Sequence, residues 1–186
     1  MPPLNNHIMK LISKPSEGEY VPYAIAYVSQ LPDDGAVLKH MAGNRDYIIA
    51  MLQSLSDEEL AYRYAPGKWN IKEVMVHVID AERIFAYRAL RIARNDKTPL
   101  SGYEQDDYVA ASNASGRDMA DILAEYEATR NASLALFHSF AEDDHLKTGI
   151  ANDHPVSVRA LAYQIAGHEL HHVKIIKERY LANDVG

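Results

Sequence analysis

Apolar residues recur at intervals of three and four along four long stretches of the chain, a spacing that places them on one face of a helix. The stretches cover residues 34–55, 70–94, 117–141 and 157–181. No strand-like alternation competes with this spacing, and no internal repeat or low-complexity tract interrupts it. We therefore predict an all-α fold in which the four helices form a bundle.

Residues with short polar side chains mark the starts of three of these helices. They are Asp33 or Asp34 for the first helix, Asn70 for the second and Ser157 for the fourth. Such side chains accept hydrogen bonds from the unpaired N–H groups of the first helical turn. Glu73, three residues after Asn70, completes a capping-box pattern at the second helix.

The rest of the chain divides into an N-terminal arm and two connections. Residues 1–33 hold five of the eight prolines, which predicts an irregular arm that packs on a bundle formed by residues 34–186. Residues 95–116 are expected to form a long loop, and loops of this length are often functional. Residues 142–155 are expected to form a polar link.

Composition and charge exclude several classes of protein. The 186 residues suffice for one domain with a full core. Because the chain has no cysteine, a metal site would depend on histidine and carboxylate ligands. The net charge of −7 argues against nucleic-acid binding. The N-terminal residues do not resemble a signal peptide, and no segment approaches the roughly 20 apolar residues of a membrane span, so we expect a cytoplasmic protein without membrane contact.

Histidines at inward-facing positions are the main candidate for chemistry. His168 and His172 are four residues apart, so their rings lie one turn apart on the same helical face, and His77 lies among apolar residues of the second helix. Burying several imidazoles without a shared partner would cost on the order of 1–3 kcal/mol each. One divalent metal ion would remove this cost and leave a fourth position open for water or substrate. The alternative is that these are core histidines with ordinary hydrogen bonds.

Other polar residues could assist such a site. Glu169 could orient a ligand or accept a proton as a catalytic base, or it could simply pair with a lysine or arginine. His40 could reach the bundle interior as a fourth ligand. Arg45 and Arg130 interrupt apolar stripes and could contact an anionic substrate group, although such arginines are more often partly exposed and structural.

The stretch from His168 to His172 also matches H-E-x-x-H, the helix motif of zinc proteases. In metzincins the motif continues with glycine and histidine, whereas Ile175 and Glu178 stand at those positions here. We therefore disfavour a protease.

Several of these residues together resemble the DinB-like superfamily, which includes the YfiT-type metalloenzymes. The resemblance is carried by residues 66–74, by His77 with residues 80–83, and by residues 167–172. It implies a four-helix bundle with a variant up-and-down connectivity, and a divalent metal held by His77, His168 and His172. It also implies a small-molecule enzyme, either a hydrolase or an S-transferase that uses a low-molecular-weight thiol such as bacillithiol or mycothiol.

The metal and the assembly follow from the same resemblance. We expect zinc or nickel, with manganese or iron also compatible, because three imidazoles suit several divalent ions. Dimers are common in the superfamily, so a homodimer is expected. The alternative from another class is a non-catalytic metal-binding or interaction domain that keeps the bundle and has no chemistry at the open position.

Overall fold

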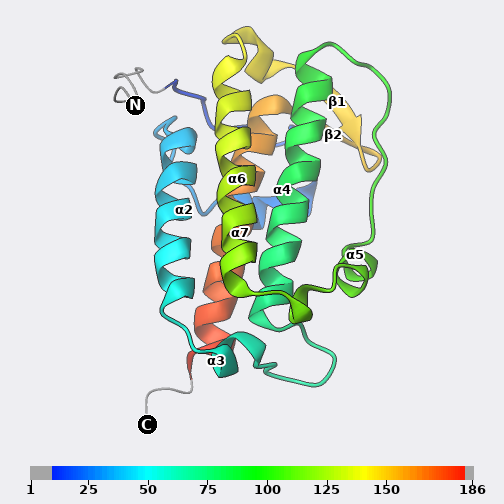
Figure 1. Cartoon of the computed structure of the whole chain (residues 1–186). Coiled ribbons are helices and arrows are strands. Elements are labelled where there is room, and N and C mark those ends of the chain that lie inside the picture. Colours follow the sequence, from blue (N-terminus) through cyan, green and yellow to red (C-terminus); the bar gives the residue numbers. More distant parts are fainter. Residues whose placement is uncertain (1–9, 183–186) are drawn as a thin grey trace.

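The computed structural model describes residues 10–182 as a bundle of four long helices (Figure 1). These helices are α2 (Val37–Gln53), α4 (Ile71–Ala93), α6 (Met119–Ser139) and α7 (Val158–Ile175), and α7 continues as one π-helical segment (Ile176–Tyr180). The predicted all-α four-helix bundle is confirmed. Residues 1–9 of the predicted arm and residues 183–186 of the predicted bundle lie outside the described residues.

The order of the helices around the bundle differs from their order in the chain. Helices α2 and α4 each pack on both α6 and α7. Going around the bundle, the order is therefore α2, α6, α4 and α7, and the connections from α2 to α4 and from α6 to α7 both cross the diagonal. This arrangement places α4 beside α7, although these helices are far apart in the sequence.

Two of the three predicted helix starts are confirmed. The side chain of Asn70 accepts a hydrogen bond from the Glu73 N–H in a complete capping box, and Ser157 accepts one from the Ala160 N–H. The prediction for the first helix is wrong, because α2 begins at Val37 after Ala36. Asp34 instead accepts a hydrogen bond from the Ala36 N–H at 2.8 Å, so its carboxylate closes the turn before the helix.

Short helices occupy parts of the arm and of the connections. A 3-10 turn (Pro22–Ala24) leads into α1 (Ile25–Val28), which packs on α7. Helix α3 (Asp57–Ala61) follows α2. Helix α5 (Gln105–Ala111) lies within residues 95–116, where we expected only a loop. Its seven residues bury one apolar side chain, Val109, so the sequence carries no helical periodicity there.

A β-hairpin replaces most of the polar link expected at residues 142–155. Strands β1 (Thr148–Ala151) and β2 (His154–Ser157) pair antiparallel, with Thr148 opposite Ser157. The turn residues Asn152 and Asp153 have φ values of 50° and 63°, and two consecutive left-handed residues form the tight turn that matches the twist of a hairpin. Leu100 forms a parallel bridge with Ala151 and ties the chain after α4 to this hairpin.

The apolar core of the bundle is divided by a layer of polar side chains. One apolar cluster contains residues 37–41, 89–93 and 158–166 together with α1, and the other contains residues 48–52, 71–79 and 173–180. Buried polar residues lie between the two clusters on α4, α6 and α7. They include His77, Glu82, Arg130, His168 and Glu169.

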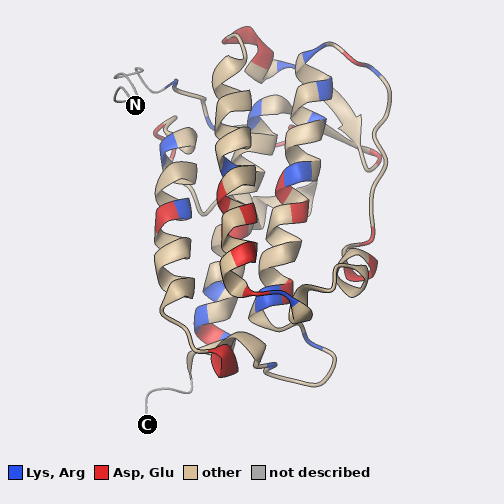
Figure 2. Ribbon diagram, viewed as in Figure 1, with Lys and Arg blue, Asp and Glu red and all other residues tan. Residues whose placement is uncertain are grey.

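The surface of the bundle carries charged residues of both signs (Figure 2). Acidic and basic residues are interspersed along the helices instead of being gathered on one of them (Figure 2). Among the described helices, none is both long and apolar enough to cross a membrane.

Candidate metal centre

The diagonal connections of the bundle bring the three predicted histidines together. His77 comes from α4, and His168 and His172 come from successive turns of α7. The Nε2 atom of His168 lies 3.0 Å from Nε2 of His77 and 3.1 Å from Nε2 of His172. One ligand atom from each ring lies within 4.8 Å of the other two. This convergence of three nitrogen atoms has the form of a three-histidine metal site.

Burial keeps the three imidazoles neutral. His77 and His168 are buried, and His172 is partly buried. Removal from solvent lowers the pKa of His77 to about 4 and that of His172 to about 3. The pKa of His168 lies well below its usual value, through burial first and the neighbouring rings second. A neutral imidazole offers a lone pair, so the donor set fits a divalent ion that accepts nitrogen ligands.

Aromatic rings surround this cluster and hold its orientation. The ring centroid of Trp69 lies 5.0 Å from that of His77. The rings of Tyr27 and Phe85 lie edge-on to His168 at 5.3 and 6.1 Å. These contacts come from α1, from α4 and from the residue before its N-cap, so several elements fix the rings.

Glu169 lies in the core behind the histidines and does not line the cavity beside them. Its carboxylate accepts hydrogen bonds from Arg130 at 2.5 and 2.9 Å, from Tyr126 Oη at 2.7 Å and from Asn44 Nδ2 at 2.9 Å. Arg130 also pairs with Glu82 at 2.8 Å. These bonds use both oxygens of Glu169 for structure. A catalytic role for Glu169 stays a prediction, and the geometry gives it no path to a substrate.

Three other predicted contacts are not found. Arg130 is fully buried between two carboxylates, so it cannot meet a substrate. Arg45 pairs on the surface with Asp46. His40 Nε2 lies 2.9 Å from Asp34 Oδ2 and takes no part in the histidine cluster. The partners of Arg130 and His40 come from neighbouring helices and from a turn, which periodicity does not reveal, whereas Arg45 pairs with the next residue of its own helix.

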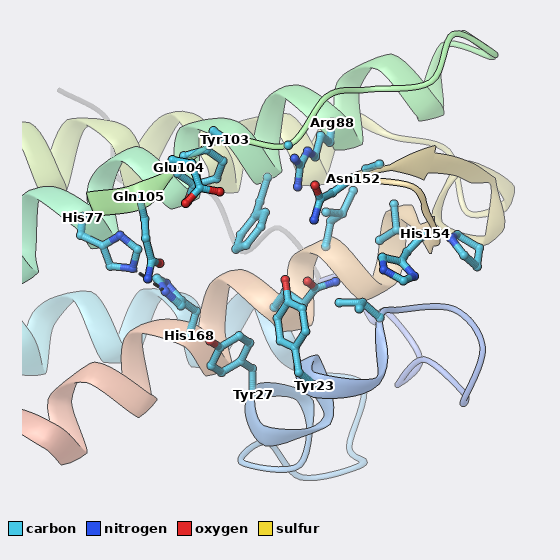
Figure 3. A pocket seen from close by; sticks show the side chains of 18 residues that line it. Tyr23, Tyr27, His77, Arg88, Tyr103, Glu104, Gln105, Asn152, His154 and His168 are labelled. Atoms are coloured by element: carbon cyan, nitrogen blue, oxygen red, sulfur yellow. Dashed lines mark hydrogen bonds between the residues drawn. The ribbon is translucent and has the colours of Figure 1, made fainter. Parts of the chain in front are cut away.

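A cavity of about 370 Å³ opens beside the histidines. His77 and His168 form part of its wall at one end, and Arg88, Asn152 and His154 lie at the other end (Figure 3). The hairpin, the segment before α5 and α1 close it from three sides. A metal ion held by the three histidines would therefore have an open side that faces this cavity.

Comparison with known families gives the wider relationship. The family model for the DinB superfamily matches residues 40–176, most of the chain. The chain belongs to the DinB superfamily. A relative from Oceanobacillus iheyensis, named "Putative metal-dependent hydrolase OB0413", is 24% identical over 128 residues, which cover 68% of this chain and 73% of that protein.

A solved structure shares the fold of this DinB-superfamily member. Its description reads "YfiT from Bacillus subtilis is a probable metal-dependent hydrolase with an unusual four-helix bundle topology". The two structures superpose with a TM-score of 0.73 at 16% sequence identity, and the match covers 89% of this chain and 94% of YfiT. The predicted membership of the DinB/YfiT group is therefore confirmed.

Several residues of the cavity in this DinB-superfamily protein were not predicted as site residues. Glu104 and Gln105 lie on the cavity wall on the same side as His77 (Figure 3), and Gln164 and Arg88 line the cavity as well. Arg88 gave one available signal, since it extends the apolar stripe of α4. Glu104 and Gln105 belong to the long loop expected at residues 95–116, whose length indicated a functional segment but did not single out these two residues.

Proposed function

We propose that this protein is a metal-dependent hydrolase of a small molecule. The observation that carries the proposal is that His77 and His168, two of the three converging imidazoles, also form the wall of the 370 Å³ cavity. A small molecule in this cavity would therefore contact the open side of an ion held there. The descriptions of OB0413 and YfiT as metal-dependent hydrolases support the same reaction class.

A bound divalent ion would act as a Lewis acid toward the bond to be hydrolysed. Residues of the chain would hold the imidazoles in place and accept the proton during hydrolysis. Trp69 packs against His77 and Phe85 packs against His168, which holds these imidazoles in place. Glu104 is the carboxylate that lines the cavity, so we assign to it the role of proton acceptor in place of Glu169.

Finer features remain part of the proposal. Zinc and nickel suit three neutral imidazoles, and both are to be tested. Transfer to a low-molecular-weight thiol is the alternative reaction at the same site, with the thiol in place of water. A homodimer and a cytoplasmic location are proposed from the resemblance and from composition.

Metal content gives the first test. We would purify the protein without a histidine tag and measure metals by elemental analysis, for the wild type, His77→Ala and His168→Ala. Near-stoichiometric metal in the wild type and loss of it in both variants is expected.

Trp69 is the single tryptophan of the chain and its ring lies 5.0 Å from that of His77. Ni²⁺ should therefore quench its fluorescence, and His40→Ala should leave the titration unchanged.

Activity gives the second test. The metal-loaded protein would be screened against ester and amide substrates, with and without glutathione or cysteine. We expect Glu104→Gln to reduce kcat by about 10²–10⁴-fold, the contribution typical of a general base, and to leave metal content unchanged. If no metal binds after reconstitution, or if Glu104→Gln retains full activity, the proposal or its proton acceptor is contradicted.

A further inference from the structure

Arg88 is a buried cation without an anionic partner in the described part of the chain. Only 8% of its surface is exposed. Its guanidinium forms one hydrogen bond, from Nη2 to the carbonyl oxygen of Ser101 at 2.8 Å. Burial lowers the pKa of Arg88 from its usual value, but an arginine still carries its charge at neutral pH. Proteins normally compensate a buried charge with a counterion or further hydrogen bonds, and residues 10–182 supply neither to Arg88.

The second buried guanidinium among the described residues shows the contrast. Arg130 is held by Glu82 and Glu169, and each carboxylate pairs with it directly. Both arginines lie in the interior of the bundle, but only Arg88 lines the cavity. Structural packing therefore accounts for Arg130 and leaves the charge of Arg88 unexplained.

Gln164 is another polar residue of the same cavity, and its side-chain nitrogen lacks a hydrogen-bond acceptor among residues 10–182. It lies on α7, and 5% of its surface is exposed. Its Nε2 atom is buried, and no acceptor within the described residues reaches it. Buried donors are nearly always paired, because an unpaired donor loses its bonds to water. Arg88 and Gln164 thus offer hydrogen-bond donors to one space.

The end of the cavity around Arg88 has the shape and charge for a small anion. Figure 3 shows the Arg88 side chain directed toward Asn152, at the end of the cavity away from His77. The wall also includes the rings of Tyr23 and Phe85. The cavity therefore joins a cationic end to the histidine end (Figure 3).

We propose that Arg88, with Gln164, binds a carboxylate group of the substrate whose hydrolysed bond lies at the three histidines. This inference rests on the proposed hydrolase function and adds the substrate class, a small carboxylic acid. A planar carboxylate accepts two parallel hydrogen bonds from one guanidinium. A single negative charge matches the single arginine of the cavity lining, and Glu104, which lines the same cavity, would repel a doubly charged phosphate more strongly.

Hydroxamates with a second functional group test both ends of the cavity at once. We would use the monohydroxamates of succinic, glutaric and adipic acid, together with the neutral terminal amides of the same lengths, on zinc-loaded protein. Binding is measured by isothermal titration calorimetry. At one chain length the carboxylate should bind about 10–100-fold more tightly than its amide, as expected for a charge-assisted hydrogen bond in a dry site.

Two substitutions separate recognition from folding. Arg88→Gln removes the charge but keeps an N–H group for the Ser101 carbonyl, and it should abolish the preference for the carboxylate. Arg83→Gln is the matched control, because Arg83 is an exposed residue of the same helix that pairs with Glu125; it should keep the preference. Thermal unfolding would show whether each variant is folded.

Gln164→Met removes the unpaired donor at constant side-chain length. We expect affinity for the carboxylate hydroxamate to fall about three- to tenfold, the effect of one lost hydrogen bond. The free energy of unfolding of the ligand-free protein should stay the same or rise, because the donor has no partner to lose. A loss of stability without a loss of affinity would assign Gln164 to structure and overturn its part of the proposal.

The outcomes distinguish this inference from the proposed function. If neutral hydroxamates bind, but no chain length prefers the carboxylate or Arg88→Gln keeps the preference, the carboxylate site is overturned and the metal site stands. A phosphonate that binds more tightly than the carboxylate would also overturn it. If neutral hydroxamates do not bind, the metal function fails. The anion end is then tested alone, with 4-phenylbutyrate against 4-phenylbutyramide on metal-free protein by ligand-observed NMR, and equal binding of the two to wild type would refute it.

Discussion

The backbone of Tyr27 packs directly on Gly167, the residue before His168. A Cβ atom added at Gly167 would lie 2.1 Å from the carbonyl oxygen of Tyr27, so no side chain fits there. The same tyrosine places its ring against His168 and His171, with centroid distances of 5.3 and 5.4 Å. The described part of the N-terminal arm thus holds α7 at the position from which its histidines meet α4.

Gly167→Ala should displace the arm from α7. Overpacking of this kind costs about 1–3 kcal/mol, and we expect a loss of that size in the free energy of unfolding from urea denaturation. Zinc affinity should fall as well, because His168 adjoins the displaced contact. Gly43→Ala is the control: Gly43 lies inside α2 with nothing within 4 Å of an added Cβ. It should stabilise the protein by about 0.5–1 kcal/mol. A Gly167→Ala variant as stable as wild type would contradict the close packing.

Arg130→Met should be among the most destabilising single changes in the bundle. It leaves the carboxylates of Glu82 and Glu169 buried without a cation, and breaking one side of a buried ion pair costs about 3–5 kcal/mol. The comparison is Arg83→Met, which breaks a half-exposed pair with Glu125 and should cost about 1 kcal/mol or less. Urea denaturation measures both variants.

Removing the carboxylates as well should restore much of that stability. The triple variant Arg130→Met, Glu82→Gln and Glu169→Gln carries no buried charge in this layer, so it should be more stable than Arg130→Met alone. If the single and triple variants are equally stable, the buried charges are not the cause of the loss.

His145→Leu should stabilise the protein, and more so in acid. His145 is buried, and neither ring nitrogen has a partner among the described residues. Burial lowers its pKa to about 4, from about 6.5 in the unfolded chain. Above pH 6.5 the ring is neutral in both states. As the pH falls from 6.5 to 4, only the unfolded state gains the proton, so the wild type loses stability in this range.

The measurement is the difference in unfolding free energy between His145→Leu and wild type. We expect about 1–3 kcal/mol in favour of the variant at pH 8, where the unpaired nitrogens alone contribute. This difference should grow between pH 6.5 and 4 and stay constant below pH 4. A difference that is independent of pH would contradict the low pKa of His145.

Zinc affinity should resist acid better than that of exposed histidines. Protons compete with the metal for each imidazole only below its pKa. Because the pKa of His77 is about 4 and that of His172 about 3, affinity should stay nearly constant from pH 8 to 5 and fall below about pH 4. Titration followed by Trp69 fluorescence or calorimetry tests this. A fall that begins near pH 6.5 would show that the imidazoles are solvated.

The helices could be predicted from the sequence because each repeats its pattern several times. Helices α2, α4, α6 and α7 contain 17 to 23 residues, so each is long enough to repeat the spacing of three and four several times. The strands of the hairpin have four residues each, too few for a clear alternation. The turn at Asn152 and Asp153 was the available signal, since these residue types tolerate the left-handed conformation.

In the candidate site, features set by spacing within one helix could be predicted from the sequence, and contacts between helices could not. The pairing of His168 with His172 follows from spacing within one helix. His77 joined them because it lies among apolar residues of the second helix, and the family resemblance implied the same three ligands. Arg88 and Arg130 look alike in the sequence, since both interrupt or extend an apolar stripe. Which of them is free to bind an anion depends on Glu82 and Glu169, which reach Arg130 from two other helices. The pattern along one helix cannot show which residues of other helices pair with an arginine.

The bridge between Leu100 and Ala151 joins two segments of the cavity wall that can vary without moving the helices that carry the histidines. The histidines depend on the register of α4 against α7, and any shift there would disperse them. Other parts of the cavity wall belong to the hairpin and to the segment before α5, which are joined to each other by this bridge. Insertions or substitutions at the hairpin turn can therefore reshape the space for the substrate while the helices keep their places. One part of the chain is open to diversification, and the other is bound to a single geometry.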